Sequence, residues 1–338
     1  MYKYYNSNKM FFLFILFFST LISISSNSWF GCWIGLEINL LSFIPLISNP
    51  NNMMMSEASL KYFLTQTIAS INFLFMILMK MFLLNFFKFE NLIMIMINSS
   101  LLMKIGSFPF HFWFPNIIEG LSWFNTFLLL TWQKISPMIL LSYYFNKNFI
   151  ILIMMFNSII GAIGGINQSS IRKLMVFSSI NNLSWMLAAI LISENLWLLY
   201  MFIYSFIISL MCYLFYMTNT FYINQMFLMN FNSLIKILLT INFLSLGGLP
   251  PFIGFFSKWI IINFLLMNNF FILTFIFVMM SLIMLFFYIR IVYSSIMFNY
   301  LKMKWMKLMI KNNFLILFIL LINMISILGI MLSTFFFF

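Results

Sequence analysis

Apolar stretches of about 20 residues, each long enough to cross a lipid bilayer as a helix, recur from one end of this chain to the other. Of its 338 residues, 64% are hydrophobic and only 7% are charged. No long window is polar enough to supply the surface of a separate soluble domain. The sequence therefore predicts an all-α polytopic membrane protein with a single membrane domain, residues 1–338.

About eleven transmembrane helices are expected from a window of roughly 20 residues moved along the chain. The ninth of these apolar runs is too long for one straight crossing and has two prolines near its middle, so we expect a broken helix there. The expected spans are 9–26, 29–48, 57–79, 91–113, 121–145, 149–167, 171–192, 196–218, 234–266, 270–295 and 313–333.

The fourth and ninth spans are interrupted by the same Gly-x-x-Pro spacing, at residues 106–109 and 247–250. Paired interruptions in two halves of a chain indicate an inverted-repeat transport fold with its site at the breaks. The offset of five helices favours this interpretation, because an odd number of helices per repeat inverts the second copy. Two unrelated proline kinks are the alternative. The predicted parts are a first repeat at about 9–145, a second repeat at about 149–295 and a C-terminal helix at 313–333.

Lysines and arginines of the expected loops predict the orientation of the chain. Eight of them lie on the face of the N terminus and two on the opposite face, and such cations favour the inner side. We therefore expect the N terminus inside and the C terminus outside. The eight are Lys3, Lys9, Arg172, Lys173, Lys302, Lys304, Lys307 and Lys311, and the two are Lys88 and Lys147.

Carboxylates are scarce: the chain has five glutamates and no aspartate, and Glu37 falls near the middle of the second span. A charge in a hydrocarbon interior costs roughly 3 kcal/mol even on the lenient insertion scale, so it rarely occurs without a partner or a task. Gly31 and Gly35 have the spacing that lets another helix approach closely. Glu37 is predicted to be the counter-ion of a buried lysine; a carboxylate that only fixes helix packing is the alternative.

Two lysines are expected deep in the membrane. Lys134 lies roughly 16–20 Å from either end of its span at 1.5 Å per residue, too far for its side chain to reach the interface. Pro137 leaves the carbonyl of Gln133 without its helical donor, and Pro109 does the same for the residue that follows Lys104. A lysine in such a place can gain and lose a proton near neutral pH, as a proton relay requires.

Lys258 is a third candidate, although it lies nearer the end of its span. For each of the three lysines the alternative is a structural residue that is permanently paired or reaches a cavity. His111, the only histidine, follows the interrupted fourth span. It is either a relay member or a hydrogen-bonded structural residue among aromatic side chains, and a single histidine cannot build a bis-histidine haem or copper centre.

Other charged residues have simpler explanations. Glu57 and Lys61 have the i,i+4 spacing of a salt bridge at the start of a helix, although a relay role for Lys61 stays open. Arg172 and Lys173 open a span, where topology or lipid headgroups explain them. No cysteine cluster, phosphate-binding loop or metal-ligand set is present in the sequence, and no basic patch suggests nucleic acid.

Several motifs together resemble one known family, the subunit 2 family of mitochondrial NADH dehydrogenase, which comprises antiporter-like membrane subunits of respiratory complex I. The likeness extends over nearly the whole chain, and eleven spans fit the short animal form. The motifs are Gly35-Leu-Glu-Ile-Asn-Leu-Leu-Ser-Phe-Ile-Pro45, Glu57-Ala-Ser-Leu-Lys-Tyr-Phe-Leu-Thr-Gln66, Pro109-Phe-His-Phe-Trp-Phe-Pro115, Thr131-Trp-Gln-Lys134 and Leu246-Gly-Gly-Leu-Pro-Pro251 with Lys258-Trp259.

The resemblance implies two inverted five-helix repeats in the proton-pumping arm of an NADH:ubiquinone reductase. It implies that Glu37 and Lys104 lie in a first half-channel, that Lys134 links the halves and that Lys258 lies on the second broken helix. It implies no cofactor in this chain, with flavin, iron–sulfur clusters and ubiquinone bound elsewhere in a hetero-oligomeric complex. The implied partners are other membrane-arm subunits and lipids. The implied location is the mitochondrial inner membrane, with the N terminus in the matrix and the C terminus in the intermembrane space.

Two rival functions remain. A free-standing cation/proton antiporter would use the same buried charges without electron transfer, but a chain without aspartate lacks an obvious acidic site for Na⁺. A purely structural membrane scaffold would leave the costly interior charges unexplained.

Overall fold

A computed structural model describes residues 7–82, 90–228, 233–297, 323 and 326–327. These residues form α-helices and, apart from an isolated bridge between Ser170 and Tyr222, no β-structure is found among them. The helices are α1 (Ser7–Ser25), α2 (Trp29–Ile47), α3 (Met53–Phe82), α4 (Glu90–Ile105), α5 (Trp113–Ile118), α6 (Trp123–Leu130), α7 (Trp132–Tyr143), α8 (Lys147–Gly165), α9 (Ile171–Ile192), α10 (Glu194–Thr218), α11 (Ile223–Leu228), α12 (Ser233–Gly247), α13 (Ile253–Met267) and α14 (Phe271–Met297).

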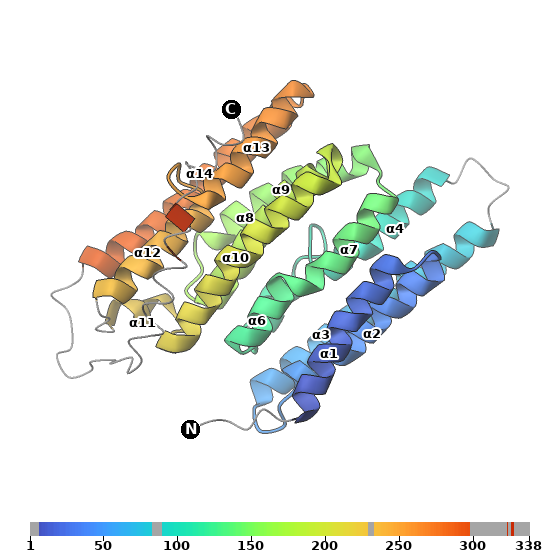
Figure 1. The fold of residues 1–338 in the computed structure, drawn as a ribbon, viewed down its shortest axis with the longest axis horizontal. Helices are drawn as coiled ribbons and strands as arrows, with labels where there is room; N and C mark the ends of the chain where they lie inside the picture. Colours follow the sequence, from blue (N-terminus) through green and yellow to red (C-terminus); the bar gives the residue numbers. More distant parts are fainter. Residues whose placement is uncertain (1–6, 83–89, 229–232, 298–322, 324–325, 328–338) are drawn as a thin grey trace. The chain divides into compact units, whose positions relative to one another are not determined.

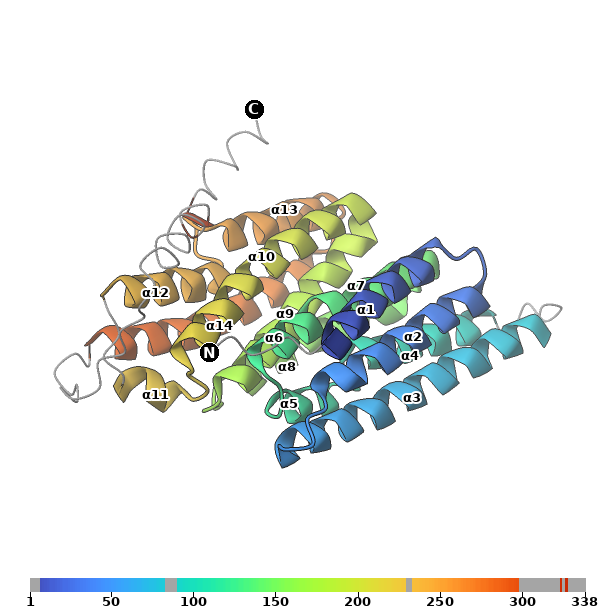
Figure 2. The ribbon, with the colours of Figure 1, turned by 60° about the horizontal axis from the view of Figure 1, so that its bottom comes forward.

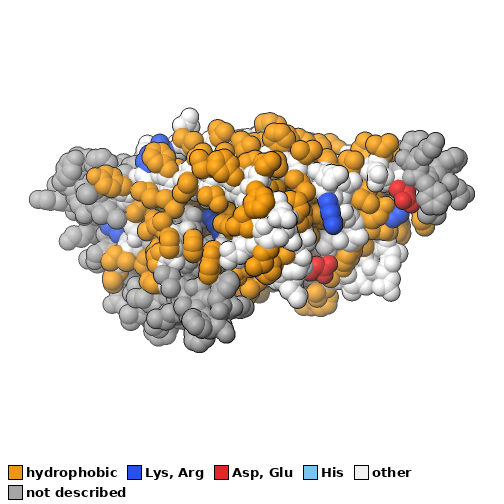
Figure 3. Space-filling view, turned by 90° about the horizontal axis from the view of Figure 1, so that it is seen from above, with side chains coloured by type: hydrophobic (Ala, Val, Ile, Leu, Met, Phe, Trp, Pro, Cys, Tyr) orange, Lys and Arg blue, Asp and Glu red, His pale blue; other side chains and the backbone are white. Residues whose placement is uncertain are grey.

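The expectation of an all-α membrane protein is confirmed, because each of the first ten expected spans corresponds to one helix or to a pair of helices. Within the described residues, seven helices are long and apolar enough to cross a membrane. The number is below eleven because three interrupted spans are divided into shorter helices and the eleventh span is not among the described helices. Hydrophobic side chains predominate on the face drawn in Figure 3, as expected for a surface in contact with lipid. The eleventh span, 313–333, lies almost wholly outside the described residues.

The chain divides into two compact units, residues 1–153 and 154–338, with the boundary inside α8. In the first unit α2 packs against α1 and α3, and α4 packs against α3 and α7 (Figure 1). In the second unit α10 packs against α9, α12 and α13, and α12 packs against α14 (Figure 2). The repeat boundaries at about 145 and 149 remain predictions.

Small residues bring α1 and α2 into close contact in the first unit. A Cβ atom added to Gly35 would lie 2.7 Å from the Cβ and backbone nitrogen of Ser23, and one added to Gly31 would lie 2.9 Å from the Cβ of Ser26. Real Cβ atoms do not approach so closely, so the glycines are required for this packing. The expectation that a glycine admits a neighbouring helix is thus confirmed for Gly35, which faces Ser23 of α1, whereas Gly31 faces Ser26, in the connection after α1.

Both predicted interruptions exist, and both helices end in the same way. Gly106 has φ +79° and Gly248 has φ +82°. The Gly106 N–H donates to the carbonyl of Leu102 and the next N–H donates to that same carbonyl, at 3.0 and 3.1 Å. Gly248 and the residue after it repeat the pattern on the carbonyl of Leu244, at 3.0 and 3.3 Å. Left-handed glycines that close a helix in this manner satisfy its last carbonyls.

The structure changes the register of the second break by one residue. The matching Gly-x-x-Pro spacing of the two spans paired Gly106 with Gly247. The residue with positive φ is instead Gly248, and Gly247 is the last residue of α12. The Gly-x-x-Pro spacing still holds in the new register, from Gly248 to Pro251. Two consecutive glycines made both registers compatible with the sequence.

Alanine substitution should destabilise the protein at only one of these two adjacent glycines. Gly248→Ala places a side chain at positive φ, which costs about 1–2 kcal/mol, and its Cβ would lie 2.9 Å from the Lys258 ammonium nitrogen. Gly247→Ala is the matched control, because its Cβ would make ordinary van der Waals contacts, with the Tyr288 ring at 3.5 Å and with Leu285 at 3.7 Å. The expected result is lower thermal stability and less assembled protein for Gly248→Ala alone. Equal behaviour of the two variants would contradict the assigned register.

Candidate functional site

Three of the lysines singled out in the sequence are buried inside their units. Lys104 in the last turn of α4 has 8% of its surface exposed, Lys134 in α7 has 1% and Lys258 in α13 has 6%. Exposed lysines elsewhere contrast with them: the Lys61 side chain is 47% exposed. An ammonium group so far from water is costly and needs polar surroundings. The surroundings of each lysine therefore decide what it can do.

Glu37 occupies the middle of α2, as expected, and it acts electrostatically on Lys104 without touching it. Glu37 and Lys104 interact electrostatically, but no ion pair within 4.0 Å joins the two side chains in the described structure. The Oε2 atom of Glu37 is buried and has no hydrogen-bond partner among the described residues. A carboxylate that is coupled to a cation but not locked to it can change its partners or bind water.

A hydrogen-bonded network joins three helices of the first unit close in sequence to Glu37 and Lys134. The Gln133 amide of α7 donates to Oδ1 of Asn39 in α2 at 2.9 Å, and the Tyr62 hydroxyl of α3 donates to Oε1 of Gln133 at 3.4 Å. Gln133 directly precedes Lys134, and Asn39 follows Glu37 by two residues. The network thus fixes α7 against α2 and α3 at the level of both charged residues.

Carbonyl groups at the C-terminal end of α4 accept hydrogen bonds from neutral side chains. The Gln66 amide of α3 donates to the carbonyl of Lys104 at 3.2 Å, and the Trp113 indole donates to the carbonyl of Met103 at 3.2 Å. Carbonyls in the last turn of a helix have no partner within that helix and must find one elsewhere. The ammonium group of Lys104 is therefore not needed to satisfy these two acceptors.

Lys134 lies in the first turn of α7, just after a further interruption that the sequence did not predict. The expected span 121–145 is divided into α6 and α7 at Thr131, which has φ −117° and ψ −70°. The Lys134 N–H then donates to the carbonyl of Thr131 at 3.2 Å, three residues back. The Lys134 ammonium lies over the Phe114 ring, 5.3 Å from its centroid, in a cation–π contact. Pro137 lies inside α7 without ending it.

Lys258 lies in α13, on one side of the second break, and its side chain contacts the end of α12 on the other side. Its ammonium group donates to the carbonyl of Gly247 at 2.9 Å and to the carbonyl of Leu246 at 3.5 Å, the last residues of α12. A cation at the C-terminal end of a helix is favoured by the partial negative charge there. In the second unit a lysine thus occupies the role that neutral donors have in the first.

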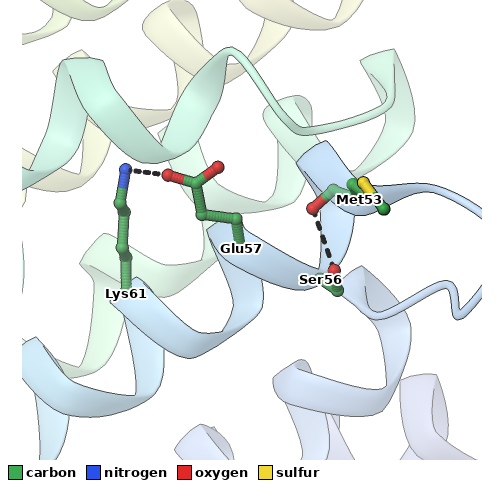
Figure 4. A network of polar contacts seen from close by, with 4 residues as sticks. All are labelled: Met53, Ser56, Glu57 and Lys61. Atoms are coloured by element: carbon green, nitrogen blue, oxygen red, sulfur yellow. Dashed lines mark hydrogen bonds and ion pairs between the residues drawn. The ribbon is translucent and has the colours of Figure 1, made fainter.

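The remaining candidates are His111, which has 7% of its surface exposed, and charged residues nearer the surface. His111 lies in the segment between α4 and α5, where its ring contacts Phe112 at 4.2 Å between centroids and Nδ1 has no partner among the described residues. Its role as a relay member stays a prediction. Glu57 and Lys61 form the expected salt bridge at 2.6 Å (Figure 4). The Arg172 guanidinium lies 4.6 Å from the Phe221 ring centroid.

Single-sequence reasoning missed the neutral residues around the charges. Asn39, Gln66 and Gln133 are polar side chains inside apolar spans, and that contrast was the available signal. No group of three or more His, Cys, Asp or Glu side chains that could hold a metal ion occurs among the described residues.

Comparisons with known proteins decide the family. Residues 26–284 match the model of the membrane domain of NADH:quinone oxidoreductase and Mrp antiporters. The chain is 50% identical over 313 residues to NADH-ubiquinone oxidoreductase chain 2 of Anopheles gambiae, with 91% of this chain and 90% of the relative covered. The protein of the same name from Aedes aegypti is 48% identical over 334 residues, with 97% of each chain covered. The chain belongs to the NADH-ubiquinone oxidoreductase chain 2 family.

The family also includes more distant members, such as chain 2 of Mus musculus, which is 36% identical over 290 residues with 83% of this chain and 84% of the relative covered. Solved structures share the fold. A chain of respiratory complex I from Thermus thermophilus has a TM-score of 0.81 at 16% identity, covering 96% of this chain and 78% of that one. A chain of the Mrp complex from Dietzia sp. has a TM-score of 0.74 at 14% identity, covering 83% and 59%.

The contribution of the Gln66 side chain to the stability of the α4 end can be tested by Gln66→Leu. This change leaves the Lys104 carbonyl unsatisfied in a buried place, which costs about 1–3 kcal/mol. The adjacent control is Thr67→Val, because the Thr67 hydroxyl bonds only to the carbonyl of Leu64 in its own helix, at 3.0 Å. Thermal denaturation of the assembled protein should show a lower midpoint for Gln66→Leu than for Thr67→Val. Equal midpoints would mean that Gln66 does not support the break.

Proposed function

We propose that this chain is a core membrane-arm subunit of an NADH:ubiquinone oxidoreductase, respiratory complex I, and takes part in proton translocation across the mitochondrial inner membrane. The observation that carries the proposal is the burial of Lys104, Lys134 and Lys258 in a chain whose relatives have that name. Three buried lysines are too costly to be retained for packing alone.

The proposed relay consists of Glu37, Lys104, Lys134 and Lys258. Quinone reduction elsewhere in the complex changes the electrostatic balance along the arm, and the coupled pair Glu37 and Lys104 responds to it. The coupling without direct contact supports this proposal, because a charge change at one residue shifts the proton affinity of the other. Lys134 and Lys258 then exchange protons with opposite faces of the membrane.

The redox steps take place outside this chain. Flavin, iron–sulfur clusters and ubiquinone are proposed to bind to other subunits, and the chain contributes no redox centre of its own. The proposed orientation has the N terminus in the matrix and the C terminus in the intermembrane space, on the basis of the eight-to-two distribution of loop cations. Its partners are other membrane-arm subunits and the surrounding lipids.

A free-standing cation/proton antiporter is the second candidate function. The matching family model covers Mrp antiporters as well as NADH:quinone oxidoreductases, and the fold is similar to that of a chain in an Mrp complex. The relatives with 48–50% identity over 90% or more of their length favour the respiratory complex. Activity of the isolated chain would favour the antiporter, whereas purification with many partners would favour the complex.

The proposed function is tested by Lys134→Met in the assembled complex. Methionine has a similar length and no charge, so it should preserve packing over Phe114 while removing the titratable group. Loss of a positioned proton carrier should lower coupled quinone reduction and proton translocation together, by about tenfold or more. Both rates are measured in membrane vesicles, relative to the amount of assembled complex.

The matched control is Lys147→Met, at the exposed start of α8. This variant removes one positive charge without touching the interior and should behave as wild type. Wild-type rates for Lys134→Met would return Lys134 to a structural role and remove the main support for the relay.

A further inference from the structure

The first turn of α7 contacts three other helices of the first unit. The Trp132 ring meets the Phe17 ring of α1 edge-on, with 4.5 Å between the centroids. The Gln133 amide donates to a side chain of α2, and the Lys134 ammonium lies over the Phe114 ring of α5. Three successive side chains thus have three different neighbours. These contacts together specify one rotation of α7 about its own axis.

Helix α6, which precedes α7 in the chain, is held by a contact of its own. The Asn125 amide donates to the carbonyl of Leu46, in the last turn of α2, at 2.9 Å. In an uninterrupted helix every residue advances by the same rotation, so this contact would also determine where Lys134 points. The backbone instead departs from helical values at Thr131, where φ is −117° and ψ is −70°. The interruption gives α7 a rotation that α6 does not dictate.

The Thr131 side chain is hydrogen-bonded at this departure. Its hydroxyl donates to the carbonyl of Phe127 at 2.7 Å, and its backbone N–H donates to the same carbonyl at 3.1 Å. The side chain is buried, with 3% of its surface exposed. Threonine hydroxyls that bond back to the preceding turn bend helices. Thr131 therefore combines the unusual backbone geometry with the side-chain bond that favours it.

Pro137 is the other nearby residue that disturbs helices. It has no N–H and leaves the carbonyl of Gln133 without its helical donor. Gln133 nevertheless lies inside α7, which continues past Pro137 to Tyr143. The departure from helical geometry occurs two residues before Gln133. Its position favours Thr131 over Pro137 as the cause of the interruption.

The rotation of α7 determines what Lys134 contacts. The Lys134 ammonium lies 5.3 Å from the centroid of the Phe114 ring. A Cβ added to Gly106 would lie 3.1 Å from Cδ1 of the same ring, so the ring is adjacent to the glycine that follows α4. A different rotation of α7 would move the ammonium group off the ring and change its distance from the α4 break.

We infer that Thr131 is a positioning residue for Lys134. Its hydroxyl, bound to the carbonyl of Phe127, keeps α6 and α7 in different rotations, and this places Lys134 over Phe114 beside the α4 break. Thr131 carries no proton and acts only through the position of Lys134. The inference rests on the proposed function and adds the residue that sets the geometry of one of its proton carriers.

The test is Thr131→Val in the assembled complex. Valine has nearly the same shape, and the carbonyl of Phe127 keeps its backbone donor, so no buried acceptor is left unpaired. Coupled quinone reduction and proton translocation, measured in membrane vesicles per amount of assembled complex, should fall about tenfold, because proton transfer depends steeply on the placement of the carrier. The matched control is Thr126→Val in α6, where the buried hydroxyl donates to the carbonyl of Trp123 at 2.7 Å. It should behave as wild type.

Two further measurements separate positioning from a structural role. Thr131→Ser keeps the hydroxyl and loses only the methyl group, so its turnover should stay close to wild type. In a Lys134→Met background, Thr131→Val should cause no additional loss, because substitutions that act through one group are not additive. The inference would be overturned by wild-type turnover in Thr131→Val, by equally low turnover in Thr131→Ser, or by the full additional loss in the double variant.

A second pair of variants keeps the test decisive if Thr131→Val does not assemble. Thr131→Ala and Thr131→Ser both lose the methyl group, and only serine keeps the hydroxyl. Alanine also has the highest helix propensity, which favours an uninterrupted helix at this position. Lower turnover for Thr131→Ala than for Thr131→Ser supports the inference, whereas equal turnover of the two variants contradicts it.

The outcomes also separate the role of Thr131 from the proposed function. Loss of pumping in Lys134→Met together with wild-type pumping in Thr131→Val would reject the positioning role and leave the relay of lysines intact. Wild-type pumping in both variants would reject both.

Discussion

The end of a helix in an apolar interior leaves carbonyl groups that water cannot reach, and each must be given a donor. This chain ends a helix in that way in each of its two units. Gly106 and Gly248 turn the backbone in the same left-handed conformation and satisfy part of the last turn. The two units differ in the donors that supply the rest. The first uses the neutral side chains of Gln66 and Trp113, and the second uses the ammonium group of Lys258.

Because the two helix ends use different donors, Lys104 and Lys258 lie in different electrostatic surroundings. Because neutral donors serve the end of α4, the ammonium group of Lys104 remains available to respond to Glu37, which acts on it from a distance. Lys258 has its charge compensated by carbonyl dipoles, in a unit with a single carboxylate side chain. A buried cation held by dipoles and not by a carboxylate can lose its proton without leaving an unpaired anion behind. The two breaks therefore create different environments for a proton carrier from one backbone motif.

Much of this arrangement follows from the sequence, because lipid permits few alternatives to a helix. Apolar length fixed the position of the spans, glycine and proline marked the breaks, and distance from the span ends indicated that Lys134 is buried. Thr131 divides a span six residues before Pro137, and Pro137 itself lies inside the intact helix α7, so the sequence did not reveal where that interruption occurs. Gln133 and Phe114 act through contacts with other helices, which depend on how each helix is rotated about its axis. A single sequence contains little information on that rotation.

The central claim is that buried lysines carry protons and do not only complete helix ends, and Lys258→Gln tests it most directly. Glutamine retains an N–H donor for the carbonyl of Gly247, as Gln66 provides one for α4, but it cannot be charged. The measurement is the ratio of protons translocated to electrons transferred, together with turnover, in assembled complex. The account predicts normal assembly with impaired proton translocation. Assembly, turnover and a proton ratio equal to wild type would show that Lys258 only closes the helix.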